Sequence, residues 1–176
     1  MRIETEVKLD YSDVLIRPKR STLKSRSQVK LERKFSFRNS KAQYQGVPIM
    51  AANMDSVGTF EMADTLANQN IFTCLVKTYS AESLVEFFLS DFPDSRRTNN
   101  VAMSIGTSDA DFLKLVEVQA QVADKLKFVC MDIANGYSDH FAAHVRKVRD
   151  QFPDLVIIAG NVVTGEMTEE LILAGA

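Results

Sequence analysis

The first residue with a chemical role to consider is a carboxylate that directly follows an apolar run. Asp132 comes after Lys-Phe-Val-Cys-Met at 127–131 and is followed by Ile-Ala-Asn-Gly-Tyr at 133–137. A short run that is apolar on both faces is typical of a parallel strand covered by helices on each side. Because parallel α/β folds keep their sites at the carboxyl ends of strands, Asp132 is predicted to lie at such a site. That Asp132 only caps its loop is an equally simple interpretation.

Polar or small residues follow the other apolar runs in the same way. The carboxyl ends of parallel strands meet at one edge, so the loops that follow them should converge on one rim. Lys77 comes directly after the run 71–76, which could bring its ammonium near Asp132. The alternative is a surface lysine whose aliphatic stem covers apolar groups. The loops concerned are 53–55, 77–79, 106–108, 132–136 and 160–164.

Each apolar run is followed by a stretch of helical periodicity that begins at a Ser or Thr. Side-chain oxygens at such positions accept hydrogen bonds from the amides of the first helical turn. Ser108 and Asp111 have the spacing of a capping box, with Asp in place of Glu. The last helix is expected over about 165–174, with Gly175 as its C-cap. The predicted N-caps are Thr59, Ser80, Ser108, Ser138 and Thr164.

The alternation of strands and helices indicates a parallel sheet with right-handed crossovers. From residue 48 onward the apolar runs begin about every 23 to 30 residues, the length of one β/α unit. A five-stranded doubly wound sheet has this order, but residues 51–57 lack the G-x-G-x-x-G of a dinucleotide-binding turn. The other interpretation is five consecutive units of a (β/α)8 barrel, which uses roughly 250 residues when complete. The spacing alone does not separate the two.

Composition indicates a soluble globular protein. The chain has 176 residues, of which 45% are hydrophobic and 25% charged, so it can bury a sizeable core. The apolar runs are only strand length and the start has no apolar signal-peptide core, so we expect a cytoplasmic protein without a membrane partner. Cys74 and Cys130 lie within apolar runs and are expected to be reduced packing residues. His140 and His144 have helical spacing but no evident third ligand, so no metal site is predicted.

Charge is distributed unevenly along the chain. Residues 1–46 carry twelve Lys or Arg against five Asp or Glu, a net charge of +7, whereas residues 47–176 carry nine against eighteen, a net charge of −9. The basic residues concentrate at 17–26, with no aromatic residue among them. This segment fits a solvated surface or a grip on the phosphates of a small ligand. Nucleic-acid binding is disfavoured because aromatic side chains that could stack on bases are lacking.

Several long motifs resemble those of the IMP dehydrogenase / GMP reductase family, in the same order and over the whole chain. The resemblance implies a TIM barrel, with a basic N-terminal arm over 1–46 that packs on the barrel and the first five β/α units over 47–176. For the reductase branch it implies NADPH-dependent reductive deamination of GMP to IMP and ammonia, a step of purine salvage, in a homotetramer. The motifs are Asp13-Val-Leu-Ile-Arg-Pro-Lys-Arg20, Ala52-Asn-Met-Asp55, Val57-Gly-Thr59, Asp132-Ile-Ala-Asn-Gly-Tyr137, Ala159-Gly-Asn-Val-Val-Thr-Gly-Glu-Met167 and Glu170-Leu-Ile-Leu-Ala-Gly175.

Two features favour the reductase branch over the dehydrogenase branch of the family. Dehydrogenases usually insert a pair of small regulatory domains after the second barrel helix, whereas residues 89–101 leave no room for them. The motif that begins at Asp132 also reads Asp-Ile-Ala-Asn-Gly, which is similar to the reductase version. An IMP dehydrogenase-type oxidoreductase therefore remains the weaker enzymatic alternative. A truncated, non-catalytic barrel that assembles with other subunits is an alternative of another class.

The resemblance implies roles for individual residues of this chain, because they occupy the positions of functional residues in the family. Lys77, Asp132 and Asn161 match residues that surround the nicotinamide and its ribose, which implies catalytic roles in positioning and electrostatics. Together with Ile133 and Ala134, Asp132 matches a segment that contacts the cofactor. A lysine and a carboxylate in such a place can hold ribose hydroxyls and fix the hydride donor over the purine.

The resemblance also implies residues for the adenosine end of NADPH and for the substrate pocket. Ser25 and Arg26 match a pair that reaches the adenosine end of NADPH bound to a neighbouring subunit. Met54 matches a residue that lines the substrate pocket for GMP or IMP, with core packing an equal alternative. One departure is local: Val76 and Thr78 flank Lys77 where family reductases have His on both sides.

The largest departure concerns the covalent chemistry of the family. Its nucleophilic Cys, which forms a thioimidate with the purine, matches a position beyond Ala176, as do the phosphate loops and the potassium site. Neither Cys74 nor Cys130 occupies that position. We therefore expect the chain to be a fragment that has no reductase activity alone.

Overall fold

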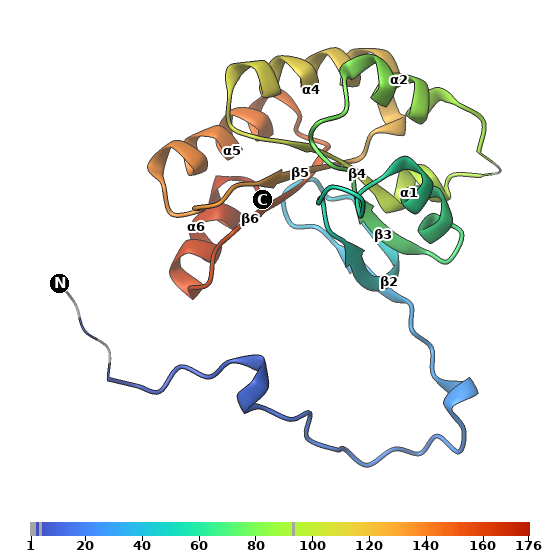
Figure 1. Ribbon diagram of the computed structural model, residues 1–176, viewed down its shortest axis with the longest axis vertical. Coiled ribbons are helices and arrows are strands. Elements are labelled where there is room, and N and C mark those ends of the chain that lie inside the picture. Colours follow the sequence, from blue (N-terminus) through green and yellow to red (C-terminus); the bar gives the residue numbers. More distant parts are fainter. Residues whose placement is uncertain (1–2, 4, 93) are drawn as a thin grey trace. The chain divides into compact units, whose positions relative to one another are not determined.

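A parallel sheet forms the centre of the fold in the computed structural model, which describes residues 3, 5–92 and 94–176 (Figure 1). Its strands pair in chain order, each parallel to the next. A further strand, β1 (Arg33–Ser36), pairs antiparallel with the first part of β2 and was not predicted from the sequence. The parallel strands are β2 (Gln43–Ala51), β3 (Ile71–Cys74), β4 (Val101–Ile105), β5 (Phe128–Asp132) and β6 (Val156–Gly160).

A helix follows each parallel strand, as predicted, and each predicted N-cap is confirmed. The oxygen of Thr59, for example, accepts a hydrogen bond from the Met62 amide at 3.1 Å. Ser108 and Asp111 form the predicted capping box. A short helix, α3 (Arg96–Asn100), and a turn of 3-10 helix, η3 (Ala123–Lys125), were not predicted. The helices that follow the strands are α1 (Phe60–Ala67), α2 (Ala81–Leu89), α4 (Asp109–Val122), α5 (Asp139–Gln151) and α6 (Gly165–Ala174).

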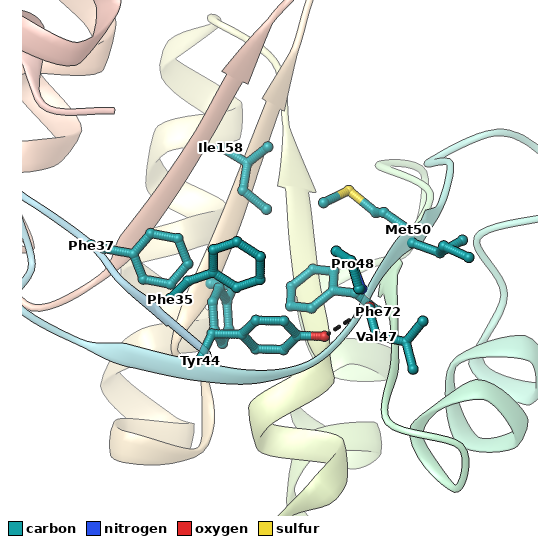
Figure 2. Close-up of a pocket in the computed structure, with 10 residues that line it drawn as sticks. Phe35, Phe37, Tyr44, Val47, Pro48, Met50, Phe72 and Ile158 are labelled. Carbon is teal, nitrogen blue, oxygen red and sulfur yellow. Dashed lines mark hydrogen bonds between the residues drawn. The ribbon is translucent and has the colours of Figure 1, made fainter. Parts of the chain in front are cut away.

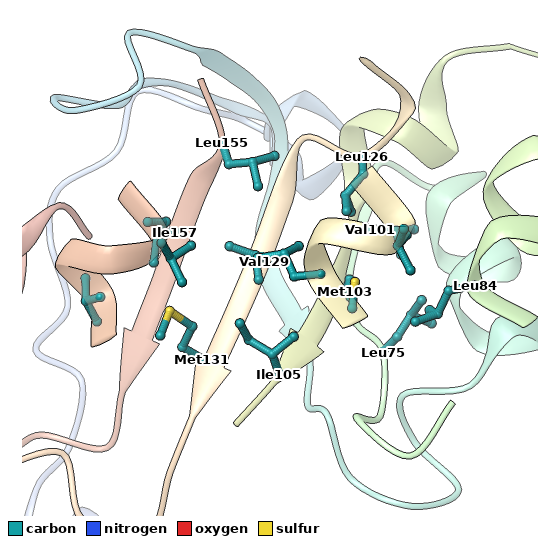
Figure 3. Packing of buried hydrophobic residues seen from close by; sticks show 14 of the residues in the cluster. Leu75, Leu84, Val101, Met103, Ile105, Leu126, Val129, Met131, Leu155 and Ile157 are labelled. Atoms are coloured by element: carbon teal, nitrogen blue, oxygen red, sulfur yellow. The ribbon is translucent and has the colours of Figure 1, made fainter. Parts of the chain in front are cut away.

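The main core lies between the sheet and its helices. In Figure 1, α2, α4 and α5 run along one side of the sheet. Alternate strand residues point to that side, since successive side chains of a strand face opposite ways. Figure 3 shows Met103, Val129 and Ile157 among these side chains, and each is at most 4% exposed. The helices therefore bury one whole face of the parallel sheet.

The opposite face of the sheet carries a second core, made with the β1–β2 hairpin. The hairpin residue Tyr44 meets Phe72 and Phe128 edge to face, with ring centroids 5.7 and 6.2 Å apart. These two phenylalanines stand at or near the first residues of β3 and β5. The hairpin thus covers the amino ends of the strands and lines an apolar hollow of about 290 Å³ (Figure 2). The loops that carry polar residues lie at the opposite, carboxyl ends of the strands.

Residues 1–30 form a separate unit from residues 31–176. Within it, η1 (Tyr11–Asp13) is capped by Asp10 and η2 (Arg26–Gln28) by Ser25. The predicted division of the chain after residue 46 stays a prediction; residue 46 lies inside β2. Throughout the described part of the chain, every helix falls short of the length and apolarity needed to cross a membrane.

Candidate functional site

Asp132 and Asn161 meet at the carboxyl edge of the sheet. Asp132 is the last residue of β5 and stands opposite Gly160, the last residue of β6. Asn161 is therefore the first residue beyond β6, and its side-chain Nδ2 donates to Asp132 Oδ1 at 3.0 Å. The same Nδ2 donates to the Ile133 carbonyl at 3.1 Å. Two of the three residues predicted to surround the nicotinamide are thus joined directly.

Backbone hydrogen bonds continue this contact beyond the ends of the strands. The Ile133 amide donates to the Gly160 carbonyl at 3.2 Å, and the Asn161 amide donates to the Ile133 carbonyl at 3.3 Å. The Gly136 amide donates to the Asn161 carbonyl at 3.1 Å. A side chain at residue 136 would place its Cβ 2.5 Å from that carbonyl oxygen, so only glycine fits there. The loop after β5 is therefore packed closely against the loop after β6.

The Asp132 carboxylate keeps capacity for a ligand. Its Oδ1 accepts from Asn161, while no hydrogen bond within the described residues uses its Oδ2. The side chains of Ala134 and Asn161 are exposed, and Asp132 is half-buried. A carboxylate oriented through one oxygen and open at the other can accept hydrogen bonds from the hydroxyls of a sugar.

Lys77 lies in the loop between β3 and α2 and is exposed. The ion pairs of the described residues do not include one between Lys77 and Asp132. What holds the loop is Lys114 of α4, whose Nζ donates to the carbonyl of Lys77 at 2.6 Å and to that of Tyr79 at 3.3 Å. Partial burial lowers the pKa of Lys114, and Lys77 lowers it further against an opposing effect of Asp111. The backbone of Lys77 is thus fixed while its ammonium remains in solvent.

The loop that carries Lys77 is also tied to the loop after β2. Tyr79 stacks on Phe60 of α1 with ring centroids 3.8 Å apart. The Val76 amide donates to the Gly58 carbonyl at 2.8 Å. A Cβ on Gly58 would clash with the Cys74 carbonyl, so this close approach requires glycine. Contacts of this kind join neighbouring loops around the rim.

The other predicted ligand residues are divided between the two units of the chain. Met54 is 63% exposed in the loop after β2, so it is not a core residue. The Ser25 hydroxyl caps η2 by accepting from the Ser27 amide at 3.3 Å, and the adjacent Arg26 is exposed. Ser25 and Arg26 belong to the unit of residues 1–30.

The two cysteines are free and buried, as predicted. Cys74 is 1% exposed and Cys130 is 6% exposed, both within the core beneath the hairpin. The Cys74 thiol donates to the sulfur of Met50 at 3.1 Å. The neighbouring Cys130 thiol, together with burial, raises the pKa of Cys74. The hydrogen bond with Cys74 lowers the pKa of Cys130 in turn, but both sulfurs are buried, which suits packing rather than attack on a substrate.

Two residues that shape this rim were not predicted from the sequence as site residues. Lys114 sits on a helix face without any distinguishing pattern. Tyr137 lies in the motif that begins at Asp132, but only its place in that motif could have drawn attention to it. Its hydroxyl oxygen accepts from the amides of Val163 and Thr164 at 2.8 and 3.0 Å.

Comparisons of this chain with a family model and with curated proteins agree with each other. The family model described as IMP dehydrogenase / GMP reductase domain matches residues 8–176. The chain is 57% identical over 176 residues to the GMP reductase of Vibrio parahaemolyticus, covering 100% of this chain and 50% of that protein. It is 56% identical over 175 residues to the GMP reductase of Caenorhabditis elegans, covering 99% and 48%. The chain thus spans about half the length of these relatives.

A solved structure supports the predicted fold. The crystal structure of inosine 5′-monophosphate dehydrogenase from Legionella pneumophila superposes with a TM-score of 0.74, over 94% of this chain and 47% of that chain. Sequence identity is 22%, so this likeness bears on the fold alone. With the order of parallel strands and helices, it confirms consecutive β/α units of a (β/α)8 barrel.

Proposed function

This chain belongs to the IMP dehydrogenase / GMP reductase family, and we propose that its function is that of a GMP reductase. The proposed reaction is the reductive deamination of GMP to IMP and ammonia with NADPH. It is assigned to the full-length protein, by which we mean this chain together with the remainder that its relatives have. The observation that carries the proposal is the Asp132–Asn161 pair at the carboxyl ends of β5 and β6, in a chain 57% identical to a named GMP reductase.

The donors and acceptors of the rim fit the nicotinamide end of NADPH. Asp132 offers its second oxygen to ribose hydroxyls, and Asn161 holds the carboxylate in place through the first. Lys77 adds a positive charge on a loop whose backbone is held by Lys114. When bound, NADPH supplies the hydride that reduces the purine. The contribution of these side chains is to fix the geometry of that transfer.

Product analysis of the full-length protein tests the proposal. We expect NADPH oxidation that depends on GMP, with one IMP and one ammonia formed for each NADPH consumed. IMP with NAD+ serves as the matched reaction of the dehydrogenase branch. Reduction of NAD+ with IMP in place of NADPH oxidation with GMP would assign the protein to that branch. Absence of both reactions in a folded full-length protein would remove the enzymatic proposal.

A further inference from the structure

Tyr137 makes an unusual contact for a surface tyrosine. Its hydroxyl oxygen accepts from the backbone amides of Val163 at 2.8 Å and Thr164 at 3.0 Å. The Thr164 hydroxyl lies 3.4 Å away. The hydrogen bonds with the Thr164 side chain and the Val163 amide lower the pKa of the Tyr137 phenol. One phenolic oxygen thus serves two amides just before the start of α6, which lack helical acceptors.

The segment held by Tyr137 is the one that carries Asn161. Only Val162 separates Asn161 from Val163, so the position of the Val163 amide restricts the Asn161 backbone. Val163 is 93% exposed, so its side chain contributes no burial that could hold the segment. Thr164 is the N-cap of α6, with Oγ1 accepting from the Met167 amide at 3.4 Å. Tyr137 therefore ties the beginning of α6 to the loop after β5.

The remaining contacts between the two loops lie on the other side of Asn161. The Asn161 side chain donates to Asp132 and to the Ile133 carbonyl, while its own carbonyl accepts from Gly136. Gly136 directly precedes Tyr137, whose amide donates to the Asn135 side chain at 3.1 Å. Asn161 is consequently held from both directions, by the strand ends on one side and by the phenol of Tyr137 on the other.

We propose that Tyr137 is a positioning residue, whose hydroxyl fixes residues 163–164 against the loop after β5 and so keeps the Asn161 amide on Asp132. Its catalytic consequence rests on the proposed function, since Asp132 and Asn161 are assigned there to the nicotinamide end of the cofactor. The structural consequence does not depend on that assignment. The two parts can therefore be measured separately.

Hydrogen exchange measures the structural part in the full-length protein. Tyr137→Phe keeps the ring and removes the atom that, among the described residues, accepts from the Val163 and Thr164 amides. We expect exchange of these two amides to accelerate about tenfold, because each loses its acceptor. Tyr11→Phe is the matched control, since Tyr11 is 94% exposed and its hydroxyl makes no hydrogen bond among the described residues. Equal exchange in wild type and Tyr137→Phe would overturn the proposal.

A double-mutant cycle with Asn161→Ala measures the catalytic part. If Tyr137 acts through Asn161, Tyr137→Phe should lower kcat about tenfold in the wild-type background and less than twofold in the Asn161→Ala background. The KM for GMP should stay within twofold, because no contact to the purine is assigned to Tyr137. The same loss of kcat in both backgrounds would show that Tyr137 does not act through Asn161 and would overturn the proposal. An inactive wild type would instead remove the proposed function, and the exchange result would then decide the role of Tyr137.

Discussion

The half-buried Asp132 and the exposed Lys77 are each held in place by one neighbouring side chain. Asp132 is oriented by one hydrogen bond from Asn161, and the Lys77 backbone is oriented by Lys114. Neither side chain belongs to the apolar cores. Their removal should therefore weaken ligand binding and turnover while leaving the packing of the protein unchanged.

We accordingly expect Lys77→Ala and Asp132→Ala to lower turnover of the full-length protein by at least about tenfold. The free energy of unfolding should change by no more than about 1 kcal/mol, as is usual for residues outside the core. Steady-state kinetics and urea denaturation measure the two quantities. Lys125→Ala and Asp150→Ala remove the same charges from exposed positions elsewhere and should be neutral. Wild-type turnover in both rim variants, or unfolding of either, would contradict the assignment.

His144 gives the stability of the protein a dependence on pH. It is 5% exposed, its Nε2 has no hydrogen-bond partner among the described residues, and burial lowers its pKa, with Lys147 and His140 adding to the effect. Asp111 and Asp109 oppose the shift. A lowered pKa in the folded state means that the unfolded chain binds the proton first as the pH falls. Stability is therefore full above the unfolded pKa of about 6.5 and declines below it.

Replacing His144 should flatten that decline. Urea denaturation of wild type and His144→Leu at about pH 7.5 and pH 5 should show a smaller loss of stability in the variant on acidification. His140→Gln is the comparison variant and should change the decline less, because His140 is exposed on the same helix and only adds to the shift of the His144 pKa. A wild-type decline that is unchanged in His144→Leu would assign the pH dependence to other groups.

At the scale of elements, Arg97 of α3 joins three helical segments. Its guanidinium donates to both oxygens of Asp64 in α1, at 2.7 and 2.9 Å, and to the Phe87 carbonyl in α2 at 2.6 Å. It also donates to the Ser90 carbonyl and hydroxyl. Arg97 is 6% exposed and lies over the Phe87 ring at 4.3 Å from its centroid. One side chain thus satisfies the end of α2 while pairing with α1.

Arg97→Met should destabilise the protein by about 2–3 kcal/mol. Loss of the guanidinium takes the Arg97 donor from the Ser90 carbonyl and leaves the Phe87 carbonyl with the Ser90 hydroxyl as donor. It also removes the charge opposite Asp64. The expected loss is below that for a fully buried pair, because the Asp64 side chain is 36% exposed. Arg96→Met is the matched control, since Arg96 pairs with Asp94 at a solvated position and should cost about 1 kcal/mol or less. Equal changes in the midpoint of urea denaturation for the two variants would refute the role of Arg97.

At the scale of the whole molecule, the residues proposed for catalysis and cofactor binding are divided between two regions of the chain. The strand-end residues lie within residues 31–176, whereas Ser25 and Arg26 lie in the unit of residues 1–30. The two cysteines of the chain are buried and therefore unsuited to act as nucleophiles. We expect the 176-residue chain, purified alone, to show no GMP-dependent NADPH oxidation, with the full-length protein as the positive control. Turnover by the chain alone, after removal of host enzymes, would contradict this expectation.

The basic segment at 17–26 leads to a separate prediction for the cofactor. In the full-length protein, Arg26→Ala should raise the KM for NADPH several-fold and leave the KM for GMP unchanged, because an arginine contact to phosphate or ribose contributes about 1–3 kcal/mol. Arg20→Ala removes a second exposed charge from the same segment and serves as the control. Unchanged values for both substrates would mean that Arg26 is a solvated charge. A rise for GMP alone would place the segment at the purine nucleotide instead.

Local patterns in the sequence were sufficient for the framework of the fold. The apolar runs that precede Asp132 and Gly160 form strands, with these two residues as the last of β5 and β6. The Ser or Thr before each following helix caps it, because periodicity and capping act between residues two to four apart. The same patterns placed Asp132 at the carboxyl edge of a parallel sheet. They also placed both cysteines in the interior.

The contacts that shape the rim depended on the register of distant segments. Asp132 and Asn161 are 29 residues apart, Tyr137 and Val163 are 26 apart, and Lys114 reaches the Lys77 carbonyl across 37. The β1–β2 hairpin and the Arg97 cluster likewise required the packed structure. Such contacts leave no periodic pattern, because a side chain finds its partner only after strand pairing and loop conformation have fixed both ends. The sequence alone therefore determined the order of the strands and the starts of the helices that follow them. The exact bounds of β2 and β3, and the hydrogen bonds that orient Asp132 and Asn161, arose only from tertiary packing.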